Sequence, residues 1–541
     1  MIITYTINGV LRTSDFCGDE SYDDFSLTTT EKNGIFEAVL TAEKELTLRS
    51  AEHSLPQNFA KKDLIFANGY QSWTETKEFR HGEHLNDLSK VPKFLEEKFA
   101  FSAYGSQNFA PQPKGALIGF DLFYIEGKEP VFFGNLNYRS AYLMIRPEPK
   151  MNKIVLQSDV EGRHLSPGES FTIFRYLSRP AGKAGMKEYF ATFPKRTIEK
   201  HFGYTSWYNH YQNINEELMN KALEGLDKRF DLFQIDDGFE PFVGDWMETD
   251  EKKFPNGLDP LVKKVHNKGL LAGIWLAPFA VEKKSKLYRE HPEYLAKDAV
   301  GKPIPAGGNW SGFSPLDLNC PEAVDYVRWV LRRYVELGFD FFKLDFLYAV
   351  NLAPLHGKTR AETAEFAYSL VREELQGKLI LGCGATLSNG YEKFDYMRIG
   401  PDVSLKFDDV AYMRLFHPER ISTKVTLCNT IFRHPMNGRV FGNDPDVFLL
   451  RDENISLSKE QRNALSTINA LFGSLLMTSD NPGSYDIEKQ AQLEKILTLS
   501  KSATVNDYRR KGNKIYIYYD IDHTRLVYIY DMKKGVLRHG R

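Results

Sequence analysis

The pattern of strand-like and helix-like segments changes at about residue 203, and this change constrains the fold more than any other feature of the chain. From there to about residue 480, short apolar runs typical of buried strands alternate with segments of helical apolar spacing. We predict eight strands, over residues 203–208, 231–236, 270–278, 339–344, 378–382, 397–399, 425–431 and 474–477. This number and rhythm predict a (β/α)8 TIM barrel. A doubly wound sheet shares the rhythm, but no glycine-rich phosphate loop follows the first strand.

The segments on either side of the predicted barrel are rich in short strands. Before it, runs of β-branched and aromatic residues are separated by turn signals such as Glu126-Gly127 and Pro167-Gly168, which indicates a β-sandwich. After it, residues 514–519 and 525–530 are typical of strands. We therefore predict an N-terminal β-sandwich domain over 1–190, a catalytic barrel over 191–485 and a small C-terminal β domain over 486–541.

Charge, cysteine content and hydropathy exclude several classes of partner. The 70 Lys and Arg residues nearly balance the 72 Asp and Glu residues, and no basic stripe favours nucleic acid. No apolar run approaches the roughly 18 residues of a membrane helix, and the first residues lack the pattern of a signal peptide. The cysteines, Cys17, Cys320, Cys383 and Cys428, have no metal-type spacing. We expect a cytoplasmic protein without disulfides, nucleic-acid partner or membrane partner.

Two carboxylates follow strand-like runs of the predicted barrel, and each has a cation nearby. Asp345 ends the run after Lys343, and Asp402 follows Arg398 by four residues. Because active sites of barrel enzymes form where the strands end, both carboxylates are candidates for catalysis. Two carboxylates that face each other are the minimal equipment for cleaving a glycosidic bond.

The surroundings of the two carboxylates suggest different roles. Lys343 points to the same face of the strand as Asp345, so we expect its ammonium to lower the pKa of Asp345 and keep this nucleophile ionised. Asp402 would be the acid/base, with a pKa raised by the charge of Asp345. The structural alternatives are a buried Lys–Asp pair in the first case and a turn residue after Pro401 in the second.

Further polar and aromatic residues fall at the same predicted rim. The consecutive carboxylates Asp236 and Asp237 can accept hydrogen bonds from sugar hydroxyls, although one cap and one turn residue would give the same sequence. Trp207 and Trp275 are candidates for stacking on a sugar or for core packing, and Cys383 is interpreted as a wall residue of the pocket.

No metal or organic cofactor is expected. The sequence has no His-Glu-x-x-His motif and no paired cysteine spacing. Asp444 and Asp446 in the segment Asn443-Asp444-Pro445-Asp446 are interpreted as turn residues rather than metal ligands.

Taken together, these segments resemble glycoside hydrolase family 36, the α-galactosidase family of clan D, and in particular its shorter members. The resemblance covers nearly the whole chain. It is carried by residues 68–73 (NGYQSW), 206–208 (SWY), 234–238 (QIDDG), 244–246 (GDW), 273–279 (GIWLAPF), 343–345 (KLD), 382–384 (GCG) and 398–402 (RIGPD).

The resemblance implies roles for individual residues. Asp345 matches the nucleophile and Asp402 the general acid/base. Asp236 and Asp237 match the pair that binds the 4- and 6-hydroxyls of galactose. The remaining matches are ring-hydroxyl contacts for Lys343 and Arg398, a stacking wall for Trp275, the pocket floor for Trp207 and Tyr208, the wall near carbon 2 for Cys383, and closure of the site from above by Tyr70 or Trp73.

The implied activity is that of a retaining, exo-acting α-galactosidase, which releases terminal α-D-galactosyl residues from small galactosides and oligosaccharides by double displacement. The alternatives on the same fold are an α-N-acetylgalactosaminidase and a raffinose-synthase-like transglycosylase. A catalytically silent sugar-binding module and a metal-dependent barrel lyase are alternatives of other classes. The sequence itself does not specify an oligomeric state, although members of this family often assemble into homo-oligomers.

Overall fold

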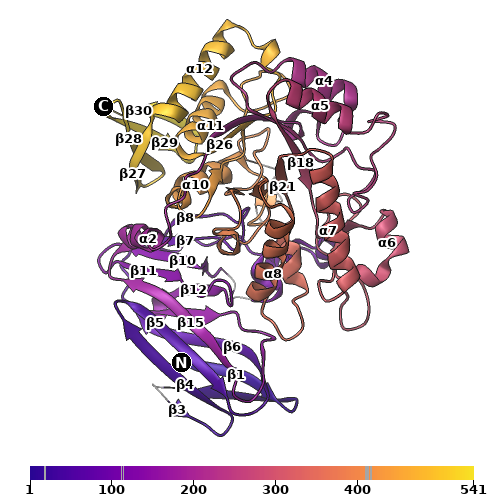
Figure 1. The fold of residues 1–541 in the computed structure, drawn as a ribbon. Coiled ribbons are helices and arrows are strands. Elements are labelled where there is room, and N and C mark those ends of the chain that lie inside the picture. The colour runs from indigo at the N-terminus through magenta and orange to yellow at the C-terminus, as the bar shows by residue number, and fades with distance from the viewer. Residues whose placement is uncertain (17–19, 111–112, 114, 409–412, 415–416, 541) are drawn as a thin grey trace.

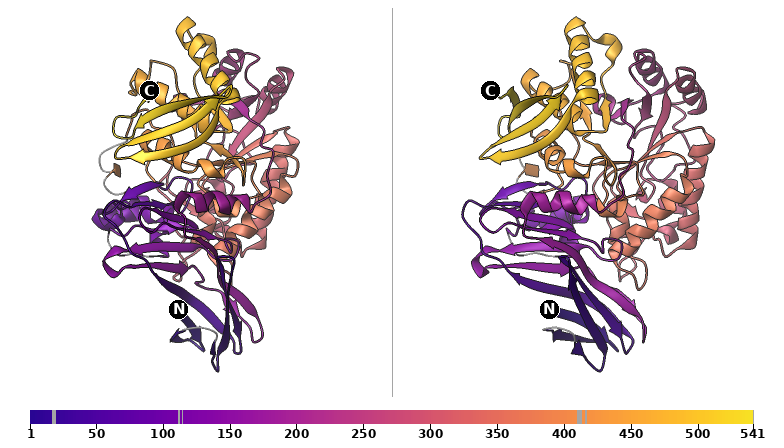
Figure 2. Two further views of the ribbon diagram at one scale, coloured as in Figure 1. Left: turned by 90° about the vertical axis from the view of Figure 1, so that its left-hand side faces the viewer. Right: turned by 60° about the vertical axis from the view of Figure 1, so that its left-hand side comes forward.

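The computed structural model describes residues 1–16, 20–110, 113, 115–408, 413–414 and 417–540. A β-sandwich forms one end of the molecule, a barrel follows, and a small C-terminal sheet lies against the barrel (Figures 1 and 2). The predicted fold class, a TIM barrel with flanking β domains, is confirmed. None of the helices in the described ranges combines the length and apolar character needed to cross a membrane.

The N-terminal sandwich consists of two antiparallel sheets whose inner faces form one apolar core. Along β1, Ile3, Tyr5 and Ile7 are buried while their neighbours are less so, which is the alternation of a half-buried strand. One sheet contains β1 (Ile2–Ile7), β2 (Val10–Asp15), β6 (Leu46–Pro56), β9 (Gly119–Phe120), β12 (Leu143–Glu148), β13 (Lys153–Ser158) and β14 (His164–Leu165). The other contains β3 (Glu20–Ser21), β4 (Phe25–Lys32), β5 (Ile35–Ala42), β7 (Leu64–Ala67), β8 (Lys77–Arg80), β10 (Leu122–Glu126), β11 (Val131–Asn135) and β15 (Ser170–Arg179).

Between β8 and β9 the sandwich extends a largely helical segment toward the barrel. It contains η1 (Leu88–Lys90), α1 (Lys93–Phe99), η2 (Phe101–Tyr104) and η3 (Ser106–Asn108). The helix α2 (Gly182–Ala191) then connects the last strand of the sandwich to the barrel.

The barrel is a parallel sheet whose strands are almost entirely buried, as expected for a sheet covered by helices on one side and filled with side chains on the other. In spatial order it contains β24 (Gly442–Asp444), β23 (Tyr396–Arg398), β22 (Leu379–Gly382), β21 (Phe341–Leu344), β18 (Leu271–Leu276), β17 (Leu232–Ile235), β16 (His201–Thr205), β26 (Leu475–Thr478) and β25 (Val447–Phe448). The first and last of these belong to one chain segment interrupted by Pro445 and Asp446, so the sheet closes on itself.

The seventh strand was predicted at the wrong place. Residues 425–431 lie within the helix α10 (Thr423–Phe432), whose N-terminus is capped by the side chain of Ser422. Residues 425–432 are all buried, so the segment shows no helical periodicity and cannot be distinguished from a buried strand by pattern. The first strand also ends earlier than predicted, because α3 (Trp207–His210) begins directly after Ser206.

The other helices surround the barrel and agree with the predicted alternation. The helix α8 starts with a capping box formed by Thr359 and Glu362, and α11 with one formed by Ser458 and Gln461. The set comprises α4 (Glu216–Glu224), α5 (Asp259–Asn267), α6 (Lys286–Glu290), α7 (Pro321–Glu336), α8 (Arg360–Glu374) and α11 (Lys459–Phe472), with a small sheet of β19 (Ala280–Glu282) and β20 (Phe313–Pro315).

The C-terminal part begins with α12 (Ile487–Ser502), which packs on α11. It continues as a four-stranded antiparallel sheet of β27 (Thr504–Lys511), β28 (Lys514–Ile521), β29 (Thr524–Asp531) and β30 (Val536–His539). The two predicted strands are β28 and β29, and the outer two were not predicted. The thiols of Cys320, Cys383 and Cys428 are free, and Cys17 lies outside the described residues.

Candidate active site

A cavity of about 390 Å³ opens at the rim where the barrel strands end. The structure brings six of the predicted site residues together in its inner half, which we define as Asp236, Asp237, Trp275, Lys343, Asp345 and Asp402. They come from β17, β18, β21 and β23 or the residues that directly follow them. A cavity of this volume is at the lower end of the range for small-molecule sites and is suited to one or two sugar rings.

Asp345 is buried and held by two hydrogen bonds. Its Oδ2 accepts from Nε1 of Trp275 at 3.0 Å, and its Oδ1 accepts from the backbone N–H of Phe346 at 2.8 Å. Burial raises the pKa of Asp345, the ammonium of Lys343 opposes this, and the negative charge of Asp402 adds to it. The prediction that Lys343 keeps this pKa low is therefore wrong in its net direction, because desolvation outweighs the attraction.

Lys343 forms its ion pair with Asp236. The distance from Nζ to Oδ2 is 2.9 Å, and both side chains are almost completely buried. The same carboxylate accepts from Nε2 of Gln234 at 2.7 Å and from the hydroxyl of Thr205 at 3.2 Å. Burial alone would lower the pKa of Lys343, but the charge of Asp236 more than offsets this, and the pKa is raised. The ammonium is therefore charged and fixed at the cavity wall.

Asp237 points into the cavity beside this pair. It accepts from Nε2 of Gln212 at 3.1 Å and from Nε1 of Trp310 at 2.9 Å. Burial raises the pKa of Asp237. Gln212 and Trp310 also line the cavity, and neither was predicted, because both lie in loops whose position depends on the folded barrel.

Asp402 is held by Arg398, which also binds two further carboxylates. The guanidinium contacts Asp402 at 2.9 Å, Asp444 at 2.8 Å and Asp446 at 3.0 Å. The side chain of Asp402 is 29% exposed, whereas those of the other three residues are at most 4% exposed. Asp402 is therefore the member of the group that is accessible from the cavity.

The interpretation of Asp444 and Asp446 as turn residues is incomplete. Asp446 does have a left-handed backbone, with φ of 71°. Its carboxylate nevertheless also accepts hydrogen bonds from the hydroxyl of Tyr208 and from the backbone N–H of Val403. Burial raises its pKa to about 7. Asp444 ends β24 and Asp446 lies between β24 and β25, so placing the seventh strand at 425–431 concealed their position at the rim.

Three of the predicted contact residues lie behind the cavity wall. Arg398, Tyr208 and Cys383 are buried and are not among the residues that line the cavity. Burial and the neighbouring Asp345 raise the pKa of Cys383, so its thiol stays protonated. Trp207, by contrast, does line the cavity.

The outer wall of the cavity comes from segments far away in the sequence. We define it as Trp73, Phe99, Phe101, Tyr104, Met413, His417, Glu419 and Ile421. Trp73, which was predicted to close the site, belongs to it. Tyr70 points elsewhere, and its hydroxyl accepts a hydrogen bond from Nδ2 of Asn351 at 2.8 Å.

A fully buried arginine of the barrel fixes the loop that carries Trp73. Arg433 donates from Nε to Oδ1 of Asn68 at 3.0 Å and from Nη1 to the carbonyl of Ser72 at 2.6 Å. Its Nη1 also reaches the carbonyl of Ile399 near the end of β23, at 2.7 Å. The loop is thereby attached directly to the barrel rim.

Side chains of the types that bind metal ions do not cluster in the ranges that the structure describes. No group of three or more His, Cys, Asp or Glu side chains there is arranged to hold a metal ion. The charges of the inner half are instead arranged as carboxylate–cation pairs.

Comparison with known proteins agrees with this geometry. Residues 198–379 match the family described as Melibiase. The chain is 30% identical over 169 residues to α-galactosidase 1 of Pediococcus pentosaceus and 31% identical over 170 residues to an α-galactosidase of Escherichia coli. These alignments cover 28% and 29% of this chain and 22% and 23% of the relatives.

The fold is similar over almost the full chain to solved structures. TtGalA, an α-galactosidase from Thermus thermophilus solved with p-nitrophenyl α-D-galactopyranoside, has a TM-score of 0.72 and 24% identity, with 97% of this chain and 98% of that chain covered. The GH36 α-galactosidase AgaA from Geobacillus stearothermophilus has a TM-score of 0.60 and 16% identity, with 94% and 73% covered.

The family match within the barrel and the shared fold support an assignment of the chain to glycoside hydrolase family 36.

Coverage differs between the two kinds of comparison. The aligned segments span about a fifth of the length of the curated relatives, whereas the Thermus structure is covered almost completely. The Melibiase match lies within the barrel. It begins at residue 198, just before β16, and ends at residue 379, where β22 begins. It therefore includes Asp236, Lys343 and Asp345 but neither Asp402 nor the outer wall.

Proposed function

We propose that this family 36 protein is a retaining, exo-acting α-galactosidase. It removes terminal α-D-galactosyl residues from galactosides and galacto-oligosaccharides by double displacement, without a metal or organic cofactor. The observation that carries the proposal is that Asp345 and Asp402, which follow β21 and β23, line one sugar-sized cavity in different environments. Asp345 is buried and doubly hydrogen-bonded, whereas Asp402 is partly exposed and held by Arg398.

The two environments support two different roles. Asp345 is oriented by Trp275 and Phe346, so its carboxylate is positioned to attack the anomeric carbon without rearrangement. Asp402 protonates the leaving oxygen in the first step and takes a proton from water in the second. Retention requires the two carboxyl groups to lie roughly 5–5.5 Å apart, whereas inversion requires about 6.5–9.5 Å.

The pair Lys343–Asp236 and the carboxylate of Asp237 recognise the sugar ring. The ammonium donates to ring hydroxyls, and the two carboxylates accept from them in a water-poor cavity. The indole of Trp275 packs against the apolar face of the ring. These contacts fix the ring between Asp345 and Asp402.

A panel of p-nitrophenyl glycosides tests this proposal. We expect release of p-nitrophenol from the α-galactoside to exceed that from the α-N-acetylgalactosaminide, the α-glucoside and the β-galactoside. Faster turnover of the α-N-acetylgalactosaminide would favour the first alternative activity. Products longer than the substrate, formed at high acceptor concentration in preference to free galactose, would favour a transglycosylase.

A further inference from the structure

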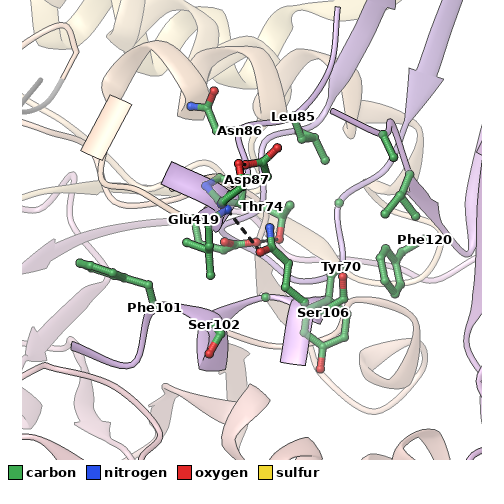
Figure 3. A pocket seen from close by; sticks show the side chains of 18 of the residues that line it. Tyr70, Thr74, Leu85, Asn86, Asp87, Phe101, Ser102, Ser106, Phe120 and Glu419 are labelled. Atoms are coloured by element: carbon green, nitrogen blue, oxygen red, sulfur yellow. Dashed lines mark hydrogen bonds between the residues drawn. The ribbon is translucent and has the colours of Figure 1, made fainter. Parts of the chain in front are cut away.

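A second cavity of about 280 Å³ lies beside the catalytic cavity, at the junction of the N-terminal domain and the barrel. Its walls come from residues within 69–74, from described residues between Leu85 and Phe120, and from Pro418 and Glu419 (Figure 3). It contains none of the residues of the inner half. The mechanism proposed above makes no use of it.

The side chains of this second cavity combine aromatic rings with neutral polar groups. Tyr70, Phe101 and Phe120 supply apolar surface, and the polar groups are those of Thr74, Asn86, Ser89, Ser102, Ser106 and Gln107. No Lys, Arg or His is among the described residues that line it. Because phosphate and carboxylate ligands require cations or aligned N–H groups, this composition favours a neutral ligand with several hydroxyls.

The two acids of the second cavity differ in whether a carboxyl oxygen remains to hydrogen-bond a ligand. Asp87 is already engaged: Oδ1 accepts from the backbone N–H of Ser89 at 2.9 Å, and Oδ2 accepts from the backbone N–H of Gly115 at 3.2 Å. In Glu419, Oε1 accepts from the hydroxyl of Thr74 at 2.8 Å. Asp87 therefore has a structural role, and Glu419 is the acid that has an oxygen for a ligand.

The second oxygen of Glu419 faces a nitrogen without a proton. Its Oε2 lies 3.5 Å from Nδ1 of His417, but this nitrogen already accepts the backbone N–H of Glu419 at 3.0 Å. This backbone N–H occupies the single in-plane lone pair of Nδ1, so the nitrogen offers neither a proton nor a free lone pair to Oε2. Burial lowers the pKa of His417 to about 3, so the ring is neutral. Because Nδ1 is already engaged, a ligand hydroxyl is a better partner for Oε2, both when Glu419 is ionised and when it carries the proton that its raised pKa favours.

We propose that the second cavity binds a neutral monosaccharide. Its volume is just below the range of drug-sized sites, which limits the ligand to about one sugar ring. The rings of Tyr70, Phe101 and Phe120 pack against the apolar face of the sugar, and Glu419 hydrogen-bonds one of its hydroxyls. This proposal is independent of the hydrolytic activity, because binding needs none of the residues assigned to catalysis.

Phe101 and Glu419 line both cavities. A sugar in the second cavity thus contacts side chains that also form the outer wall of the catalytic cavity. Occupancy of one cavity is therefore expected to change affinity in the other, with a coupling that is equal in both directions.

Titration calorimetry with D-galactose and D-glucose tests the proposal on the intact chain. The variants Ser106→Trp and Ser102→Trp each place an indole in the second cavity, and Ser502→Trp is the matched control at an exposed position. We expect wild type and the control to bind one more equivalent of at least one sugar than the two filled variants, with a dissociation constant on the order of 1 mM. The filled variants should retain the far-ultraviolet circular dichroism and the cooperative thermal unfolding of the wild type.

The chemical class of the ligand is tested by D-galactose 6-phosphate, which carries the same ring with an added anion. We expect it to leave the second cavity empty, because no cation lines the described part of this cavity. The proposal is overturned if both folded Trp variants bind every sugar with wild-type stoichiometry. It is also overturned if the wild type binds neither sugar outside the catalytic cavity, or if the 6-phosphate displaces galactose from the second cavity.

Discussion

The inner half and the outer wall of the catalytic cavity are built on different principles. The inner half consists mainly of charged groups at strand ends. Asp236 and Asp402 form ion pairs, with Lys343 and with Arg398 behind the wall. Asp237 and Asp345 are held by hydrogen bonds. The outer wall consists mainly of aromatic and apolar side chains from loops and short helices of two domains. In the proposed mechanism, the strands place the groups that react, and the loops form the surface that meets the leaving group.

The contacts within each part reflect this difference. In the inner half, ion pairs and hydrogen bonds of 2.7–3.2 Å fix every carboxylate. In the outer wall, Phe101 and Tyr104 both meet the ring of His417 edge-on, at 5.1 and 5.5 Å between ring centroids. Removing one charge leaves its partner buried and unpaired, whereas removing one ring loses only contact area. The predictions below use this difference.

Loss of Asp345, the proposed nucleophile, should have the largest effect. We expect Asp345→Asn to lower kcat for an aryl α-galactoside by more than about 10³-fold, because the covalent step is lost while binding remains. The measurement is initial rates with far-ultraviolet circular dichroism as a check of folding. Asp325→Asn, whose side chain is 79% exposed, is the control and should be fully active. Wild-type activity of Asp345→Asn would show that the inner half has another catalytic centre.

Breaking the buried ion pair should have the largest effect on stability. Lys343→Met removes the cation that pairs with the buried carboxylate of Asp236, and we expect the free energy of unfolding to fall by about 3–5 kcal/mol. The exposed pair Lys263–Asp259 provides the control, because Lys263→Met should change stability by less than about 1 kcal/mol. Urea unfolding of the two variants compares them. Equal losses of unfolding free energy in the two variants would contradict the distinction between buried and exposed ion pairs.

The titration of Glu419, the acid of the outer wall, should contribute to the pH dependence of stability. Burial raises the pKa of Glu419 from an ordinary 4.5 to about 7. Between these values the folded state keeps a proton that the unfolded state has lost, so this residue lowers stability progressively as pH rises through the window. We expect the free energy of unfolding of Glu419→Gln, relative to that of the wild type, to rise by about 3 kcal/mol between pH 4 and pH 8. If the difference in unfolding free energy between the two proteins does not vary with pH, the raised pKa of Glu419 is contradicted.

The smallest effect is expected from a ring of the outer wall. Phe101→Ala should raise KM for substrates with aryl or sugar leaving groups by about 3- to 10-fold and leave kcat nearly unchanged. Phe94→Ala, at a side chain that is 66% exposed and lines neither cavity, should leave both parameters unchanged. A fall in kcat as large as that of Asp345→Asn would show that the outer wall takes part in the chemistry.

The same division explains what could be predicted from the sequence. Asp236, Lys343 and Asp345 could be found because each lies in or directly after an apolar run of the repeating barrel pattern. Asp444 and Asp446 were interpreted as turn residues, and their position at the rim was missed because the almost entirely buried α10 was predicted as the seventh strand. Apart from Trp73, the outer wall could not be predicted, because residues such as Phe101 and Glu419 are more than 300 residues apart and meet only through packing of two domains.

The azide reaction of Asp345→Gly tests the central claim most directly. Without the nucleophile, azide reaches the anomeric carbon from the side opposite the leaving group, so the account predicts that activity returns and that the product is β-galactosyl azide. Proton NMR of the product distinguishes the anomers. Formation of α-galactosyl azide would assign Asp345 to the acid/base role instead, and no azide product at all would contradict its role as the nucleophile.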